Sequence, residues 1–192
     1  MKKSISKTII FMGCKSCGKS TQGKAIAQSF NLPFVDTDLV IEQNTGMSVR
    51  DFYTKNGASA FMQAEEKVCH ELAESYADQS VVISTGGGIC ENAPALTVLK
   101  GLGTFVFLKL PVKVSVQRIM NRITVDECGN FQNVPSYIMV KNPKTLDEIS
   151  ALLTERFEQR TQSYQTIADI IVDIKNAPQE ENLKVILGAL NQ

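Results

Sequence analysis

Apolar residues in this chain gather in five short runs that are separated by segments with helical spacing. The runs Thr8–Met12, Pro33–Val35, Val81–Ser84, Thr104–Leu108 and Ile170–Val172 predict buried strands. Helices are predicted over Lys19–Phe30, Asp38–Gln43, Val49–Asn56, Ala60–Ala77, Ala95–Leu99, Val112–Asn121, Thr145–Tyr164 and Glu180–Leu190. Ser48 and Thr145 are candidate N-caps. Short strands that alternate with helices indicate an α/β fold, with a parallel sheet covered by helices on both faces.

The first strand and the first helix enclose a phosphate-binding loop motif. Residues Gly13-Cys14-Lys15-Ser16-Cys17-Gly18-Lys19-Ser20 fit the pattern G-x-x-x-x-G-K-[ST], and Thr21 continues the helix. Backbone N–H groups and the helix N-terminus would surround the phosphates, and Lys19 would reach the outer ones. The Ser20 hydroxyl would be a ligand for Mg²⁺, which takes oxygen ligands. The motif therefore predicts that the chain binds a nucleoside triphosphate.

Length and charge narrow the class of protein. The chain has 192 residues, which we expect to form a single domain over residues 1–192. Lys+Arg and Asp+Glu both total 20, so the balanced charge argues against nucleic acid or a membrane surface as partner. The basic residues Met1-Lys2-Lys3 are not followed by a signal-peptide pattern. We therefore expect a cytoplasmic protein, acting as a monomer.

The five cysteines do not form the pattern of a disulfide framework, because their number is odd and they are scattered. Cys14 and Cys17 form a C-x-x-C pair, which is compatible with a redox pair or half a zinc site. Both residues occupy free positions of the phosphate loop, and no second C-x-x-C follows. We therefore favour a role for both within the loop.

Two further motifs follow predicted strands, where ligands bind in parallel sheets. Asp36-Thr37-Asp38 ends the second strand, and we expect its two carboxylates to have different partners. Asp36 would face the Mg²⁺ ion, while Asp38 would hold an acceptor hydroxyl; the alternative is that Asp38 caps the next helix. Thr85-Gly86-Gly87-Gly88 ends the third strand, where glycines allow a ligand to approach the backbone or permit a tight turn.

The segment from about Arg122 to Lys144 interrupts the alternation and is predicted to be a long loop. In a nucleotide enzyme such a loop is typical of a lid that excludes water, and Arg122 would bring a cation to the transition state. The alternative is a surface insertion. Downstream, Arg156 and Arg160 lie one helical turn apart, so both can reach the same side of the helix.

Taken in order, these motifs resemble the shikimate kinase family. The resemblance rests on Gly13–Ser20, Phe34-Val35-Asp36-Thr37-Asp38, Ile83-Ser84-Thr85-Gly86-Gly87-Gly88-Ile89, and Arg160 four residues before Tyr164 with Ile167-Ala168-Asp169 beyond. It implies a three-layer P-loop kinase fold, similar to nucleoside-monophosphate kinases, with strand order 2-3-1-4-5. It also implies transfer of the ATP γ-phosphate to the 3-hydroxyl of shikimate, with Mg²⁺.

The resemblance assigns roles to individual residues of this chain. Lys19 and Ser20 would serve ATP and Mg²⁺, and Asp36 would join the metal shell through water. Asp38 would bind shikimate hydroxyls and act as base. Gly86, Gly87 and Gly88 would line the shikimate site, and Arg160 would bind the carboxylate of shikimate. Arg122 would neutralise the transferring phosphoryl group. Arg118 and the segment Lys175–Pro178 would contact adenine.

The chain departs from the family pattern in two places. The family has Gly-Glu-x-x-Phe-Arg-x-x-Glu, whereas Met62 stands here at the position of the arginine that binds the substrate carboxylate, with Glu65 retained. Loss of one charge-assisted hydrogen bond, worth about 1.5–3 kcal/mol, would weaken shikimate binding roughly ten- to a hundred-fold unless another cation, for which Arg50 is a candidate, replaces it. The usual Arg-Pro-Leu-Leu of the lid reads Arg122-Ile123-Thr124-Val125.

These departures leave two alternatives beside a shikimate kinase. One is a kinase of the same fold that acts on another small hydroxylated metabolite, which Met62 motivates. The other is a nucleotide-binding module without catalysis, against which the intact Lys19, Ser20, Asp38 and Arg122 argue. A GTPase switch is disfavoured because the chain has no Asn-Lys-x-Asp motif.

Overall fold

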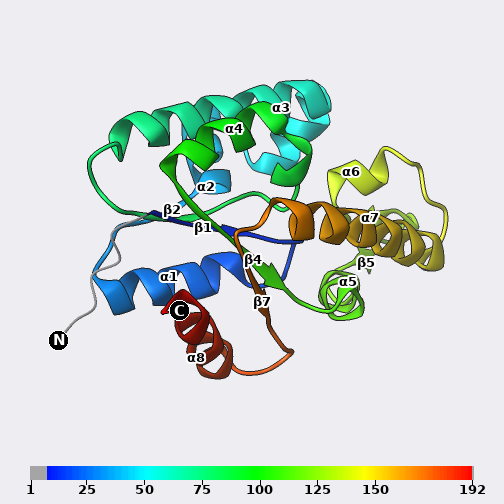
Figure 1. Ribbon diagram of the computed structural model, residues 1–192. Helices are drawn as coiled ribbons and strands as arrows, with labels where there is room; N and C mark the ends of the chain where they lie inside the picture. Colours follow the sequence, from blue (N-terminus) through cyan, green and yellow to red (C-terminus); the bar gives the residue numbers. More distant parts are fainter. Residues whose placement is uncertain (1–7, 192) are drawn as a thin grey trace.

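Five parallel strands form the central sheet of the molecule (Figure 1). The computed structural model describes residues 8–191. Its sheet contains β1 (Thr8–Met12), β2 (Phe34–Asp36), β3 (Val82–Ser84), β4 (Gly103–Lys109) and β7 (Ile170–Asp173) in the order β2-β3-β1-β4-β7. Because β7 is the fifth strand of this sheet, the predicted order 2-3-1-4-5 is confirmed.

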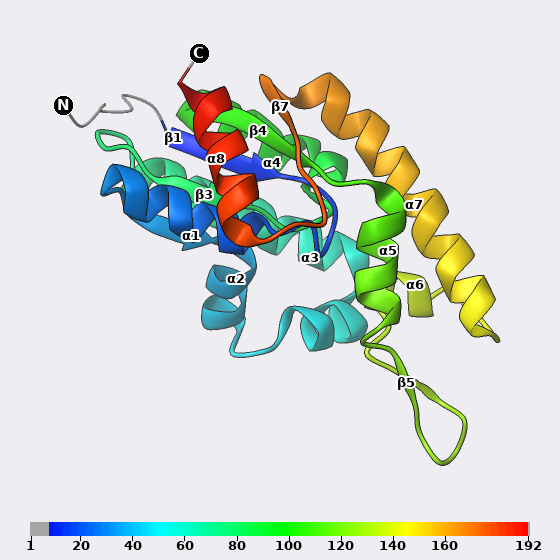
Figure 2. The ribbon, with the colours of Figure 1, turned by 90° about the horizontal axis from the view of Figure 1, so that it is seen from below.

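Helices cover both faces of the sheet, as the alternating pattern predicted (Figures 1 and 2). On one face lie α1 (Lys19–Phe30) and α8 (Gln179–Leu190). The other elements are α2 (Thr37–Thr45), α3 (Val49–Ser75), the 3₁₀ turn η1 (Ile89–Glu91), α4 (Ala93–Leu102), α5 (Val112–Met120) and α7 (Leu146–Ile167). None of the helices within residues 8–191 combines the length and the apolar character needed to cross a membrane.

The central strand β1 is apolar on both sides because it is buried between two helical layers. Ile9 and Phe11 pack with α1 and α8, whereas Ile10 and Met12 pack with the second core, to which α3, α4, α5 and α7 contribute. Side chains alternate between the two faces of a strand, so a strand buried on both faces needs an unbroken apolar run. This burial fixes the strand end at which the phosphate loop begins.

Helix α3 consists of two helical halves, as the sequence predicted. It runs from Val49 to Ser75, and a kink at Gly57, whose φ is 81° and ψ is 178°, separates the halves. Glycine adopts this conformation without a steric penalty, so the chain bends there between the two predicted helices. The predicted N-caps are confirmed, because Ser48 accepts from the N–H of Asp51 and Thr145 accepts from the N–H of Glu148.

The segment 122–144 is more ordered than the predicted loop. It contains a hairpin of β5 (Thr124–Val125) and β6 (Phe131–Gln132), followed by α6 (Ser136–Met139). The hairpin projects from the body (Figure 2), while Val134 and Ile138 are buried in the core. Strands of two residues leave no periodic signal in a sequence, which explains the error. Residues Met1–Lys3, after which the sequence has no signal-peptide pattern, lie outside the described residues.

Candidate active site

The phosphate loop joins β1 to α1 at the carboxyl end of the sheet. Gly13 has a φ of 149°, and a Cβ there would lie 2.9 Å from the carbonyl oxygen of Leu108. Gly18 has a φ of 102° and is the N-cap of α1. Both positions require glycine because of their positive φ, and Gly13 also has no space for a Cβ atom. The helix therefore begins with its N–H groups at the loop, where they favour an anion.

Lys19 is folded back onto this loop. Its Nζ donates to the carbonyl oxygen of Gly13 at 2.9 Å and to that of Cys14 at 3.2 Å, and the residue is only 7% exposed. A lysine side chain rotates easily about its four-carbon stem, so the ammonium can exchange these neutral carbonyls for the stronger attraction of a phosphate.

Oxygen-bearing side chains from three elements meet beside the loop. The Ser20 hydroxyl donates to Oδ2 of Asp36 at 2.5 Å and lies 3.3 Å from the Ser84 hydroxyl. The other carboxylate oxygen of Asp36 accepts from the N–H of Asp38 at 3.1 Å. Asp36 is thus the N-cap of α2, and the alternative in which Asp38 has that role is wrong. A serine hydroxyl and a carboxylate are the oxygen donors that Mg²⁺ uses beside nucleotide phosphates.

Asp36 and Asp38 have different partners because the chain changes from strand to helix between them. In an extended chain, residues two apart would share a face, whereas here Asp38 lies in the first turn of α2. Its Oδ1 is buried and has no hydrogen-bond partner within residues 8–191. Burial raises the pKa of the Asp38 carboxyl and the Asp36 charge adds to this rise, while Lys19 and Lys15 oppose it. Asp38 is therefore a more basic carboxylate than an exposed one.

Arg118 ties the phosphate loop to the segment after β7. Its guanidinium donates to the carbonyl oxygen of Ser16 at 2.9 Å and to Oδ1 of Asn176 at 2.8 Å. The structure thereby brings together Arg118 and part of the predicted adenine contact Lys175–Pro178. The backbone N–H and C=O of Lys175 are held by the Asn182 side chain, and Lys175 lies outside the cavity lining.

Glu65, from the second half of α3, faces Asp38 across Gly86. Its Oε2 accepts from Nδ2 of Asn92 at 2.9 Å, while Oε1 is buried without a partner within residues 8–191. A Cβ at Gly86 would lie 2.9 Å from both Asp38 Oδ1 and Glu65 Oε1. Burial raises the Glu65 pKa to about 7, and the hydrogen bond from Asn92 opposes this rise. Asn92 also donates to the carbonyl oxygen of Met62 at 2.9 Å.

Each glycine of the triplet Gly86-Gly87-Gly88 makes room for a different group. Gly86 accommodates the two carboxylates just described, and its N–H donates to Oγ1 of Thr37. A Cβ at Gly87 would lie 2.9 Å from the backbone nitrogen of Lys15, and one at Gly88 would lie 2.9 Å from Nη2 of Arg160. The sequence predicted close approach to a ligand; in the structure, the triplet also brings the acceptor side chains and the phosphate loop together.

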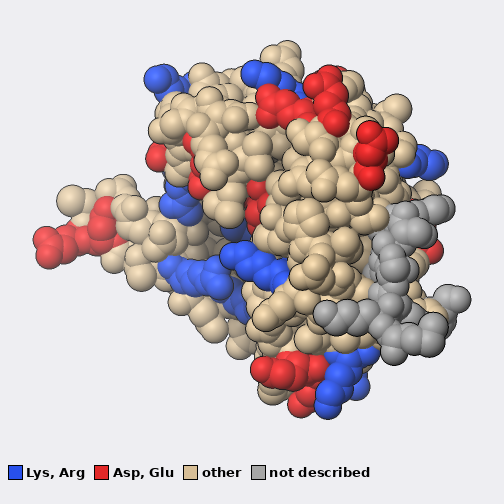
Figure 3. All heavy atoms as spheres, turned by 90° about the vertical axis from the view of Figure 1, so that its left-hand side faces the viewer, with Lys and Arg blue, Asp and Glu red and all other residues tan. Residues whose placement is uncertain are grey.

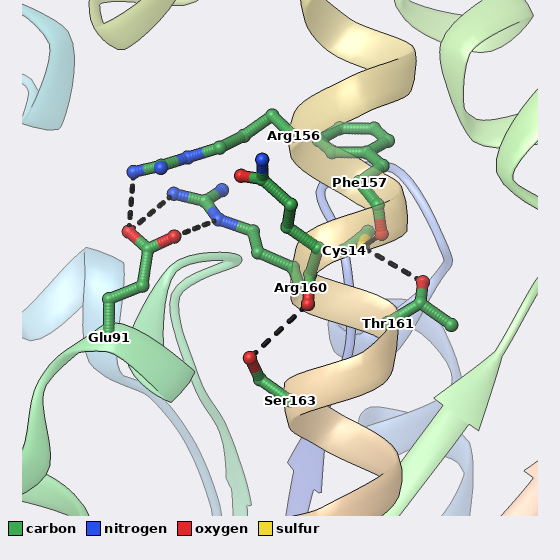
Figure 4. Close-up of polar contacts among 8 residues, drawn as sticks. Cys14, Glu91, Arg156, Phe157, Arg160, Thr161 and Ser163 are labelled. Carbon is green, nitrogen blue, oxygen red and sulfur yellow. Dashed lines mark hydrogen bonds and ion pairs between the residues drawn. The ribbon is translucent and has the colours of Figure 1, made fainter.

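Arg160 and Arg156 extend from α7 toward the same carboxylate (Figure 4). Arg160 is 5% exposed; its Nε donates to Oε1 of Glu91 at 3.0 Å and its Nη2 to Oε2 at 3.1 Å. Arg156 Nη2 donates to the same Oε2 at 2.7 Å. The Tyr137 ring lies against the Arg160 guanidinium, with 4.8 Å between Cζ and the ring centroid. The carboxylate and this cation–π contact fix the position of a buried positive charge.

Most of the predicted site residues border one cavity of about 1110 Å³. Figure 3 shows Lys and Arg side chains gathered in a hollow on one face, beside a projecting segment with acidic side chains at its tip. The predicted residues that line the cavity are Lys15, Ser16, Gly18, Lys19, Ser20, Thr21, Asp36, Asp38, Met62, Gly86, Gly87, Gly88, Arg118, Arg122 and Arg160. Pro135, Ser136 and Tyr137 of segment 122–144 also border it, as does Arg50.

Three predicted loop residues, Gly13, Cys14 and Cys17, lie behind the cavity wall rather than on it. The Cys14 thiol packs against α7, 3.7 Å from the carbonyl oxygen of Phe157 and 3.9 Å from the Thr161 hydroxyl (Figure 4). All five cysteines are free, and no cluster of three or more His, Cys, Asp or Glu within residues 8–191 could hold a metal ion. Both cysteines are buried in the phosphate loop, where the motif places them.

Sequence reasoning missed four residues that shape the site: Glu91, Asn92, Tyr137 and Thr37. Each acts through a contact with a residue distant in sequence, so no local pattern announces it. Of the four, Glu91 was the easiest to predict from the sequence. It is an acidic residue three positions after the glycine triplet, and so lies at the same strand end as the predicted cations.

Comparison with known proteins places this geometry in a family. The family model described as shikimate kinase matches residues 15–191. A shikimate kinase from Aquifex aeolicus (strain VF5) is 34% identical over 180 residues, which are 94% of this chain and 94% of the relative. A crystal structure of shikimate kinase from Bacteroides thetaiotaomicron has a TM-score of 0.76 and 27% identity, covering 97% of this chain and 99% of the other. Shikimate kinase from Acinetobacter baumannii in complex with shikimate has a TM-score of 0.74 and 27% identity, covering 94% and 90%. The chain belongs to the shikimate kinase family.

Proposed function

We propose that the protein is a shikimate kinase that transfers the γ-phosphate of ATP to the 3-hydroxyl of shikimate. The observation that carries the proposal is the content of one cavity: a phosphate loop, the buried carboxylate of Asp38, whose Oδ1 has no hydrogen-bond partner within residues 8–191, and the buried cation of Arg160. A triphosphate, an acceptor hydroxyl and a carboxylate each have a complementary group there. The relatives named above support the assignment.

The nucleotide would bind along the loop from Gly13 to Thr21. Backbone N–H groups of the loop and the N-terminus of α1 would hold the phosphates, with Lys19 at the outer ones. Arg118, placed by Ser16 and Asn176, would lie beside the adenine. Lys175 would join this contact only after its side chain turned toward the cavity.

Mg²⁺ fits the donor set at the loop. Ser20 and Asp36 supply two adjacent oxygens, and nucleotide phosphates and water would supply the others. When bound, the ion neutralises charge on the phosphates. Ser20 would contact it directly, and Asp36 would act through water while it holds the start of α2.

The acceptor hydroxyl would be activated by Asp38. As the shikimate oxygen bonds to the γ-phosphorus and the bond to the leaving ADP oxygen breaks, the hydroxyl proton passes to the Asp38 carboxylate. The raised pKa of Asp38 suits this role, because a more basic carboxylate takes the proton more readily. Lys19 and Arg122 would neutralise charge on the transferring group, so catalysis rests on positioning and electrostatics.

The rest of the cavity would hold and enclose the acceptor. Gly86, Gly87 and Gly88 would line the shikimate site, and Arg160 would bind the carboxylate. We propose segment 122–144 as the lid. Its α6 already contacts α3, since the Thr54 hydroxyl lies 3.1 Å from that of Ser136. Only the hairpin would then have to move to exclude water, because α6, at the foot of the proposed lid, is already packed against α3.

A coupled assay of ADP release with MgATP and shikimate tests the proposal, with ³¹P NMR to identify the 3-phosphate. We expect turnover with the unmodified protein and none with Lys19→Met, which removes the phosphate-binding cation. Absence of turnover at millimolar shikimate would contradict the proposal.

A second candidate has one observation in its favour. Met62 borders the cavity where the family pattern has a carboxylate-binding arginine, so a hydroxylated metabolite without a carboxylate is the alternative acceptor. A panel of polyols in the same assay distinguishes the two: a higher kcat/KM for any neutral polyol than for shikimate would favour the alternative.

A further inference from the structure

Met62 stands on α3 at the position where the family pattern has a carboxylate-binding arginine, so the acceptor end of the cavity lacks that cation. A thioether cannot form an ion pair, so a substrate carboxylate would meet Arg160 alone unless another element supplies a cation. The inference below rests on the proposed function, because it concerns how this chain binds the carboxylate of its substrate.

Arg156 shares its carboxylate partner, Glu91, with Arg160. The two residues are four positions apart on α7, which places both side chains on one face of the helix. They meet at a single carboxylate, because Oε2 of Glu91 accepts from Arg156 at 2.7 Å and from Arg160 at 3.1 Å. Both line the cavity that Met62 also lines. The geometry shows that a carboxylate fits between these two guanidinium groups.

The charges at this cluster leave a place for a second carboxylate. Two guanidinium groups carry two positive charges, and Glu91 neutralises one of them. Each guanidinium has five N–H donors, and Glu91 engages three of the ten. The Arg156 side chain is 40% exposed and lines the cavity, so a ligand there can reach it. The cluster therefore has both net charge and free donors for an anion.

We propose that Arg156 supplies the second carboxylate-binding cation of this enzyme, on α7 instead of α3, and compensates for Met62. Glu91 holds both guanidinium groups in place for the substrate through these hydrogen bonds. Arg50, the substitute considered from the sequence, borders another part of the wall: its backbone carbonyl faces the Ser136 hydroxyl of α6, and its charge acts on Lys15 of the phosphate loop.

Arg156→Gln tests the proposal, with Arg50→Gln as the matched control. Each variant is assayed with shikimate and with its neutral carboxamide, in parallel with KM for ATP and the melting temperature. We expect Arg156→Gln to raise KM for shikimate roughly ten- to a hundred-fold, as for one charge-assisted hydrogen bond, with KM for ATP within about twofold. The preference for acid over amide should fall with Arg156→Gln and persist with Arg50→Gln. Met62→Arg added to Arg156→Gln should restore most of the lost affinity.

The outcomes separate this inference from the proposed function. If the unmodified protein phosphorylates shikimate but Arg156→Gln keeps its KM and its acid preference, only the inference is overturned. Equal losses for acid and amide would also overturn it, because they would indicate a structural role. If the unmodified protein does not phosphorylate shikimate, the proposed function fails and the inference fails with it.

Discussion

Glu65→Gln should stabilise the protein in alkaline solution and leave its stability unchanged in acid. The Glu65 carboxyl is buried beside Asp38, which raises its pKa from 4.5 to about 7. The folded state therefore binds this proton more tightly than the unfolded state does. Between these two pH values the unfolded chain has lost the proton while the folded chain retains it, so stability falls as the pH rises.

The size of this effect follows from the difference of about 2.5 pH units between the two states. At about 1.4 kcal/mol for each unit, the ionised Glu65 costs the folded protein about 3 kcal/mol above pH 7. Glutamine carries no charge at any pH and can still accept from Nδ2 of Asn92, so the variant avoids the cost. For a chain of this length, 3 kcal/mol corresponds to roughly 6–12 °C in melting temperature.

Urea unfolding at pH 5 and pH 8 measures the difference. The variant should exceed the unmodified protein by most of the 3 kcal/mol at pH 8 and by much less at pH 5. Glu74→Gln, at an exposed position on the same helix, is the control and should give the same small change at both pH values. A gain from Glu65→Gln that is equal at the two pH values, or a loss confined to pH 8, would refute the reasoning.

Three further variants test the catalytic assignments. Asp38→Asn should lower kcat by about 10²- to 10⁴-fold with little change in the Kd for ATP, and an unchanged kcat would exclude it as the base. Gly88→Ala should raise KM for shikimate by about tenfold, since its Cβ would displace Arg160, and an equal rise for ATP would indicate a wider disturbance. Ser20→Ala should increase the Mg²⁺ concentration needed for half-maximal activity, which a titration at fixed ATP would measure.

The sheet and the phosphate loop were predictable because their signals are local. A strand buried on both faces is an uninterrupted apolar run, and the loop needs glycine at Gly13 and Gly18 for backbone reasons. The five strands accordingly match the prediction, and their order matches the one that the resemblance to the shikimate kinase family implied. The hairpin of segment 122–144 and α6 were not predicted, because elements of two to four residues are held by tertiary contacts, such as the burial of Val134 and Ile138, rather than by their own periodicity.

Site residues that belong to a local sequence motif could be predicted. Residues that act by contacting a partner distant in sequence could not. Asp38 and Arg160 fall where the pattern placed them, in the wall of one cavity. Glu91, which sets the orientation of Arg160, comes from a turn 69 residues away in sequence. Sequence spacing alone could not indicate which acidic residue would meet that arginine.

The hairpin of segment 122–144 contains a residue with which the proposed lid can be labelled. Cys128 is exposed in its turn, whereas Cys14, Cys17 and Cys69 are buried and Cys90 is half-buried. Burial raises the pKa of the Cys14 thiol to about 11, so only about one molecule in 10⁴ carries that thiolate at neutral pH. A maleimide dye would therefore react first at the hairpin tip, so the native sequence already contains an attachment point for a fluorophore whose emission would change if the surroundings of the hairpin change when nucleotide and acceptor bind.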